Sequence, residues 1–99
     1  MTEDTENQVI NLGEIATGPT EKLFQNPTTV GLNLERDDEI PPHSHPGTEI
    51  VLHLCEGEIE LGLDDERLTL KGGDVTKFDG GKEISLKALE RSAGVLFFG

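Results

Sequence analysis

Large aromatic side chains are scarce in this sequence. It contains no tryptophan, no tyrosine and four phenylalanines, and only 33% of its residues are hydrophobic. A chain of 99 residues buries about two thirds of the surface that it exposes when unfolded, which is enough for one small core. The length therefore predicts a single domain, and the thin core leads us to expect that association with another copy stabilises it.

Cysteine and long apolar runs are also nearly absent. Cys55 is the only cysteine, so the chain forms no internal disulfide, which agrees with a reducing cytoplasm. No apolar run approaches the about 20 residues that a membrane-spanning helix needs, and we find no signal-peptide pattern. We therefore expect a cytoplasmic protein with no membrane partner.

Positively charged residues are also scarce. Lysine and arginine together number 8, against 20 aspartates and glutamates, which gives a formal net charge of −12. This excess of negative charge argues against nucleic acid and anionic membrane surfaces as partners. Two interpretations of the acidity stay open. One is a halophilic protein in a high-salt cytoplasm, where screening removes the repulsion between carboxylates, and the other is an ordinary acidic protein.

What the sequence does contain is a series of short alternating segments. Residues 29–35 and 58–63 place apolar side chains at every second position, and shorter apolar runs follow at 68–70, 75–78, 84–89 and 95–98. Turn signals separate them about every 8 to 12 residues, the pattern of an all-β sandwich or barrel. The acidic residues 1–8 are expected to form a flexible tail, and residues 9–99 one β domain.

Residues 49–55 do not alternate in this way. One face of the segment carries three apolar side chains, but the other is only partly polar, with Val51 and Cys55 beside Glu49 and His53. If the segment is one regular strand, one face points into the barrel and the other needs a cover. A second subunit is the simplest cover, so the pattern favours a homodimer.

All three histidines lie within eleven residues, beside a glutamate. His43 and His45 are spaced so that both imidazoles leave the same side of an extended segment, with their Cα atoms about 7 Å apart. Glu49 follows after a Pro-Gly-Thr segment that can turn the chain back. Two imidazoles and one carboxylate suit a divalent transition metal and leave open coordination positions. The alternative is that these histidines lie in a loop and bind nothing.

These residues resemble the first motif of the cupin superfamily. That motif is a glycine, five residues, His-x-His, three or four residues, a glutamate, six residues and a glycine. His43, His45, Glu49 and Gly57 match it here. A second, weaker match begins with a Gly-Asp pair and includes a later glycine, at positions 73, 74 and 81. The resemblance covers residues 28–99 and implies an antiparallel jelly-roll β-barrel that holds a metal.

The chain departs from that pattern at three places. Ile84 occupies the position of the histidine that is usually the fourth metal ligand, and Ala88 occupies the position of an asparagine. Seven residues, not six, separate Glu49 from Gly57. The extra residue is expected to form a β-bulge, which would also account for the two-sided apolar segment. The resemblance therefore implies a metal held by His43, His45 and Glu49 alone.

No residue clearly replaces the missing ligand. We expect His53 to line the cavity or to lie behind the ligands, because it stands about 13 Å along an extended strand from Glu49. Glu83, next to Ile84, is a weaker substitute, and water or a substrate atom is the simplest one. Cys55 is expected to be a small, buried, apolar thiol and not a nucleophile.

Two classes of function follow from this site. In the first, an Fe, Mn, Zn or Ni ion on His43, His45 and Glu49 binds a small-molecule ligand or substrate, as in a metal-dependent oxygenase or isomerase. In the second, the barrel binds or senses a metal or small molecule without turnover, because Ile84 leaves the site incomplete. Whether the protein is an enzyme stays open, as does a barrel that has lost its metal altogether.

Overall fold

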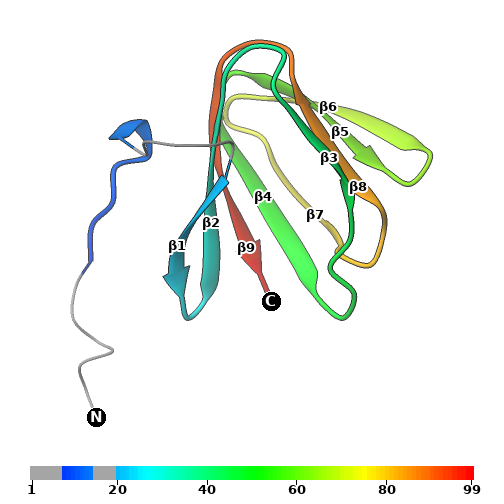
Figure 1. Ribbon diagram of the computed structural model, residues 1–99, viewed down its shortest axis with the longest axis horizontal. Coiled ribbons are helices and arrows are strands. Elements are labelled where there is room, and N and C mark those ends of the chain that lie inside the picture. Colours follow the sequence, from blue (N-terminus) through cyan, green and yellow to red (C-terminus); the bar gives the residue numbers. More distant parts are fainter. Residues whose placement is uncertain (1–7, 15–19) are drawn as a thin grey trace.

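Two antiparallel β-sheets face each other across one apolar core (Figure 1). The computed structural model describes residues 8–14 and 20–99. The five-stranded sheet runs in the order β1 (Thr20–Gln25), β2 (Thr28–Leu34), β9 (Ser92–Phe98), β4 (Glu49–Glu56) and β7 (Val75–Asp79). The four-stranded sheet runs in the order β3 (Glu39–His43), β8 (Ile84–Ala88), β5 (Glu58–Leu63) and β6 (Glu66–Lys71). The all-β prediction is confirmed.

The core comes from the strands that the sequence pattern predicted. Every second residue of β2, β4 and β5 points inward, because side chains alternate between the two faces of a strand. The largest of these side chains are at most 4% exposed: Leu32, Leu34, Ile50, Leu52, Leu54, Ile59, Leu61 and Leu63. The two facing sheets therefore bury one continuous apolar layer, in which a cavity can form.

Strand β3 was not predicted, because Pro41 and Pro42 lie inside it. Proline lacks the N–H group that a central strand must donate, so it is tolerated only at sheet edges and bulges. Both conditions hold here. β3 is the edge strand beside β8, and its register shifts between Ile40 and His43. The prolines thus prevent a helix, as expected, but they still allow an edge strand.

Gly57 joins the two sheets at a tight turn between β4 and β5. Its φ of 95° is in the left-handed region, and a Cβ atom there would overlap Ser92 and the carbonyl oxygen of Arg91. Ser92, at the start of β9, accepts a hydrogen bond from the Glu58 N–H at 3.0 Å. Only glycine allows this close approach, which explains the last glycine of the first motif.

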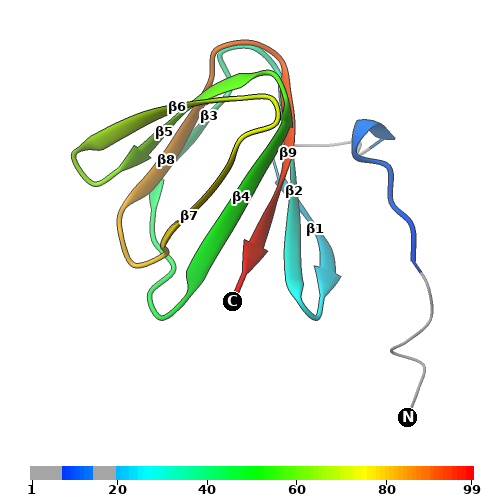
Figure 2. The same cartoon turned by 180° about the vertical axis from the view of Figure 1, so that it is seen from behind.

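The remaining described residues add little regular structure. The hairpin of β5 and β6 extends on the side opposite to β1 and β2, as the view from behind shows (Figure 2). Within residues 8–14 and 20–99, the short 3-10 helix η2 (Leu12–Glu14) is the one helical segment. No helix in these ranges is long and apolar enough to cross a membrane. Of the predicted tail, residues 1–7 lie outside the described residues.

Candidate functional site

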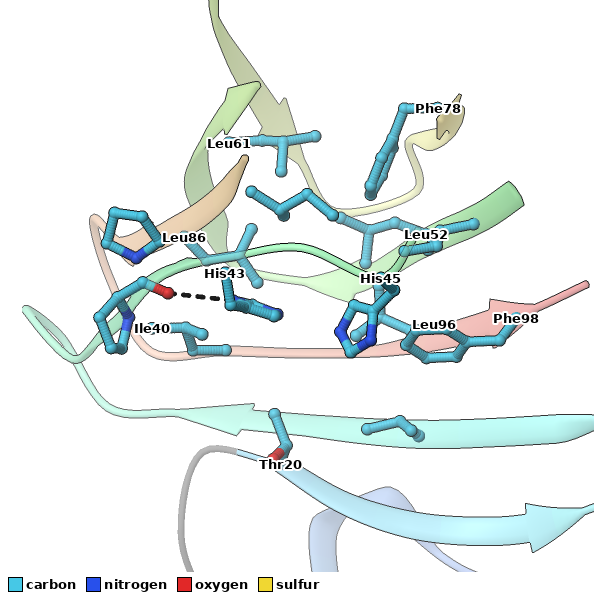
Figure 3. Close-up of a pocket in the computed structure, with 15 residues that line it drawn as sticks. Thr20, Ile40, His43, His45, Leu52, Leu61, Phe78, Leu86, Leu96 and Phe98 are labelled. Atoms are coloured by element: carbon cyan, nitrogen blue, oxygen red, sulfur yellow. Dashed lines mark hydrogen bonds between the residues drawn. The ribbon is translucent and has the colours of Figure 1, made fainter. Parts of the chain in front are cut away.

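A cavity of about 420 Å³ opens between the two sheets. Its walls come from both sheets and from the segment between β3 and β4 (Figure 3). Twelve of the fifteen residues that line it are apolar, and the other three are Thr20, His43 and His45. The apolar wall consists of Val30, Ile40, Pro41, Pro42, Ile50, Leu52, Leu61, Phe78, Ile84, Leu86, Leu96 and Phe98. None of the described lining residues is Asp, Glu, Lys or Arg.

The structure brings His43 and His45 together at this cavity. Their ring centroids are 4.9 Å apart and the rings are nearly perpendicular, with an interplanar angle of 88°. The ring of His45 also lies edge-to-face on Phe98, at 5.0 Å. Figure 3 shows the two imidazoles side by side, with Thr20 across the cavity from them. The two imidazoles thus form a polar patch on an otherwise apolar lining, and Thr20 is the third polar residue of that lining.

The loop that carries His45 is held by the turn between β7 and β8. The His45 N–H donates to the Gly80 carbonyl at 2.7 Å, and the Gly80 N–H donates to the Thr48 carbonyl at 2.9 Å. The Thr48 hydroxyl closes the loop on itself by donating to the His45 carbonyl at 2.7 Å. Three hydrogen bonds, two of them to the backbone of His45, therefore fix this loop, although it lies outside any strand.

A backbone carbonyl orients the ring of His43. Nδ1 of His43 lies 3.0 Å from the carbonyl oxygen of Pro41. Because a carbonyl oxygen can only accept, Nδ1 must carry the hydrogen, and Nε2 of the neutral ring is left as an acceptor. A histidine oriented in this way is suited to bind a metal ion or a hydrogen-bond donor through Nε2.

The environment of His45 disfavours its charged form. Partial burial lowers the pKa of His45 below its ordinary value of 6.5, and the neighbouring His43 lowers it further. At neutral pH this imidazole is therefore mainly uncharged. A neutral imidazole can act as a hydrogen-bond partner or a metal ligand, but it gives no ion pair to an anionic ligand.

Glu49 is not brought together with the two histidines. Its carboxylate makes an ion pair of 3.3 Å with Lys77, and its side chain is 68% exposed. The next residue, Ile50, takes the inward position and is 2% exposed. Among the described residues, no three His, Cys, Asp or Glu side chains are grouped so that they could hold a metal ion. The described residues thus bring His43 and His45 together but not Glu49, and the three-ligand metal centre stays a prediction.

The register of β4 explains the position of Glu49. A bulge does occur in this strand, as expected, but it lies between Leu54 and Glu56 and leaves the start of β4 unchanged. Counted from the motif residues, four residues lie between His45 and Ile50 and six lie between Ile50 and Gly57. The first interval fits the motif for both Glu49 and Ile50, whereas the second fits it only for Ile50. The sequence therefore contained a signal that Ile50 occupies the inward position.

His53 and Cys55 lie on the outer face of β4 with Glu49. His53 is half-buried between Val75 and Val95 and does not line the described cavity, so the expected cavity role is not supported by its position. Cys55 is exposed, and the expectation of a buried thiol is wrong. It occupies the bulge, on the face opposite to Leu52 and Leu54. Alternation along the strand, not hydrophobicity, decides the exposure of these side chains.

Ile84 neighbours the histidine pair from the adjacent strand of the four-stranded sheet. It is the cross-strand partner of His43 in the pairing of β3 with β8, is 4% exposed and lines the cavity. Glu83, proposed above as a substitute ligand, is exposed in the turn before β8 and does not line the cavity. Thr20, from the unpredicted strand β1, is a polar lining residue for which the sequence offered no signal.

Comparison with known families agrees with this architecture. The family model of the cupin domain matches residues 32–96, which is more than half of the chain. The chain therefore belongs to the cupin family, and the resemblance inferred from the first motif is confirmed. No curated protein matches the chain.

Several solved structures share the double-stranded β-helix fold. An RmlC-like cupin protein from Desulfovibrio desulfuricans has a TM-score of 0.81 at 19% identity, covering 95% of this chain and 97% of that one. A protein with a double-stranded β-helix domain from Klebsiella pneumoniae has a TM-score of 0.79 at 20% identity, covering 95% and 90%. KdgF from Halomonas sp. has a TM-score of 0.68 at 21% identity, covering 80% and 74%. At these identities the likeness shows the fold.

Proposed function

We propose that this cupin binds a small, mainly apolar molecule inside the barrel. The observation that carries the proposal is the wall of the cavity, in which twelve of fifteen residues are apolar. Its volume of about 420 Å³ lies within the range that small-molecule sites occupy. Apolar walls with a few polar groups at one place are typical of such sites, because burial supplies affinity and the polar groups fix orientation.

Differences in exposure among the lining residues indicate how the bound molecule is oriented in the cavity. Leu52 and Leu61 are completely buried, whereas Thr20 and His43 are exposed. The apolar part of the ligand therefore contacts the leucines, and its polar end lies near the histidine pair. A hydroxyl or amine group there can donate to Nε2 of His43, the acceptor left by the bond to Pro41.

The charge of the site favours a neutral ligand. No lysine or arginine is found among the described lining residues, so a carboxylate would be desolvated without an ion pair. The net charge of −12 further repels anions. The two imidazoles are the only titratable side chains of the described lining, and this supports binding better than turnover.

A neutral fluorescent probe tests the proposal. N-phenyl-1-naphthylamine should bind to the protein in the presence of chelator and be displaced by 1-hexanol, 1-heptanol and 1-octanol. Each added methylene should tighten binding about fourfold, because burying one stabilises by about 0.8 kcal/mol. The His43→Ala, His45→Ala variant should bind the alcohols more weakly, whereas His53→Ala, outside the described cavity lining, should not. Absence of probe binding to the folded wild type would contradict the proposal.

A divalent transition metal on His43 and His45 is the second candidate. The contact between the rings and the hydrogen bond from His43 to Pro41 favour it. Two protein ligands are fewer than the three of a typical catalytic zinc site, so an Fe, Mn, Zn or Ni ion would need further ligands from water or a bound molecule. The oxygenase or isomerase activity expected from the resemblance depends on such an ion.

Metal content separates this candidate from the first. Untagged protein, purified without chelator, should hold about one equivalent of metal that is lost in the His43→Ala, His45→Ala variant. Glu49→Gln is the matched control, because Glu49 lies on the outer face. Loss of metal in Glu49→Gln would instead support the three-ligand centre expected from the sequence. A wild type that takes up no metal after reconstitution would exclude the second candidate.

A further inference from the structure

Two isoleucines border the histidine pair, and their positions have a consequence for what the cavity accepts. We infer that Ile50 and Ile84 determine ligand preference, by placing apolar side chains where a carboxylate and an imidazole would complete a metal centre with His43 and His45. This inference rests on the proposed function, the binding of an apolar molecule, and names the residues that select it over a tightly bound metal.

Ile84 covers the histidine pair from the four-stranded sheet. Its backbone is paired with His43, so the two side chains leave neighbouring strands at the same level, where cross-strand neighbours are about 5 Å apart. Both residues line the cavity. A histidine at position 84 would therefore bring a third imidazole to the pair, and isoleucine brings an apolar surface in its place.

Ile50 lines the same cavity as the pair, from the five-stranded sheet. It is the first inward residue of β4 after the loop that carries His45, and it is paired with Phe78 and Phe98. Phe98 itself contacts the ring of His45 at 5.0 Å. A glutamate at position 50 would thus enter the cavity beside His45, which the natural Glu49 on the outer face does not do.

The side chains at positions 50 and 84 affect the binding of a metal ion and of an apolar molecule in opposite directions. With isoleucine at both, the described cavity offers an ion two imidazoles and no carboxylate, and it offers an apolar molecule a continuous wall. With glutamate and histidine, the ion gains two ligands and the wall is interrupted. Ligand preference should therefore change with these two side chains while the fold stays the same.

The double variant Ile50→Glu, Ile84→His tests this inference. We expect it to bind about one equivalent of Zn²⁺ with a higher melting temperature in the presence of the ion, because binding to the native state alone stabilises it. We expect it to bind N-phenyl-1-naphthylamine about tenfold more weakly than the wild type, the equivalent of losing roughly two buried methylenes. Ile50→Gln, Ile84→Gln is the matched control, with polar side chains of similar size that bind zinc poorly.

Three results would overturn the inference. They are a folded double variant that gains no zinc, a wild type that already binds zinc as tightly as the variant, and a glutamine control that gains zinc equally. If the double variant does not fold without zinc, the single variant Ile84→His is tested for zinc binding in its place, because it adds no buried carboxylate. Failure of the wild type to bind the probe contradicts the proposed function instead, so the two failures are distinguishable.

Discussion

At the scale of single residues, one step along β4 separates Glu49 from the cavity. Successive side chains of a strand point to opposite faces, so a difference of one residue moves a side chain from the inside to the outside. Glu49 pairs with Lys77 on the outside, and Ile50 is buried on the inside. The chemistry of the site therefore depends on which of two adjacent residues faces inward, not on the presence of a glutamate.

His45 should make stability depend on pH. Its pKa in the folded protein is lowered from 6.5, mainly by burial and also by His43, so the unfolded chain takes up a proton first as the pH falls. The free energy of unfolding should therefore decrease as the pH is lowered through about 6.5 and towards the folded pKa. Above that window His45 is neutral in both states and has no such effect.

Denaturant unfolding of chelator-treated protein at a series of pH values measures this effect. Other titrating groups are shared by the wild type and His45→Gln, so their contributions largely cancel in the difference between the two proteins. We expect the wild type to lose stability relative to His45→Gln as the pH falls from about 7.5 to about 5. Parallel stability curves, or a relative gain by the wild type, would contradict the lowered pKa.

At the scale of elements, the turn between β7 and β8 positions the histidine loop. A Cβ atom at Gly80 would meet the Thr48 hydroxyl, the His45 carbonyl oxygen at 2.8 Å and the Thr48 carbonyl oxygen at 2.9 Å. Gly80→Ala should therefore displace the loop and destabilise the protein by about 1–3 kcal/mol, the usual effect of overpacking. Thermal unfolding measures the loss, and the alcohol displacement assay should show weaker binding.

Gly81 supplies the control for this prediction. A Cβ atom there would have the side-chain oxygen of Asp79 as its nearest neighbour, at 3.2 Å, and that side chain can move. Gly81→Ala changes the same turn by the same group, so it should leave ligand affinity unchanged. Equal losses of stability and affinity in the two variants would show that the turn does not act through its contacts with the loop.

The strands that alternate cleanly could be predicted from the sequence, and the edge strands β1 and β3 could not. The predicted segment 58–63 coincides with β5, and residues 29–35 correspond closely to β2. β1 and β3 were missed because edge strands bury few side chains and because prolines interrupt β3. An alternating sequence pattern arises where one face of a strand is buried, and β1 and β3 bury few of their side chains.

The candidate site could also be predicted only in part. His43 and His45 were located by their spacing, and the structure places both at the cavity. The cavity wall could not be predicted, because its residues come from strands far apart in the sequence, such as Val30, Leu61 and Leu96. The outward direction of Glu49 follows from the pairing of β4, and the six-residue interval from Ile50 to Gly57 was the one sequence signal for it.

At the scale of the whole molecule, the outer face of the five-stranded sheet has an apolar area. We define the outer apolar face as Val51, His53, Val75, Val95 and Phe97, which neighbour one another through the pairing of β9, β4 and β7. Val75 is 62% exposed and Phe97 is 39% exposed. We propose that the outer apolar face packs against the same face of a second copy. The two-sided pattern of residues 49–55 predicts such a contact.

Light scattering after size exclusion tests the proposed dimer. The wild type should have twice the monomer mass of 10.8 kDa. Because each copy carries a charge of −12, the dimer should strengthen as added salt screens the repulsion. Val75→Glu, Phe97→Glu should be monomeric, and Leu89→Glu, an exposed residue outside this face, should not change the mass. A monomeric wild type at high salt would contradict the proposal.

The most direct test of the central claim is methyl NMR of the wild type during addition of 1-octanol in chelator. The account predicts saturable chemical-shift changes at the Ile50 and Ile84 methyl groups, which line the cavity. The Val51 and Val75 methyl groups, on the outer apolar face, should hardly change. Changes confined to the outer apolar face, or no saturable change at either isoleucine, would contradict an apolar ligand site inside the barrel.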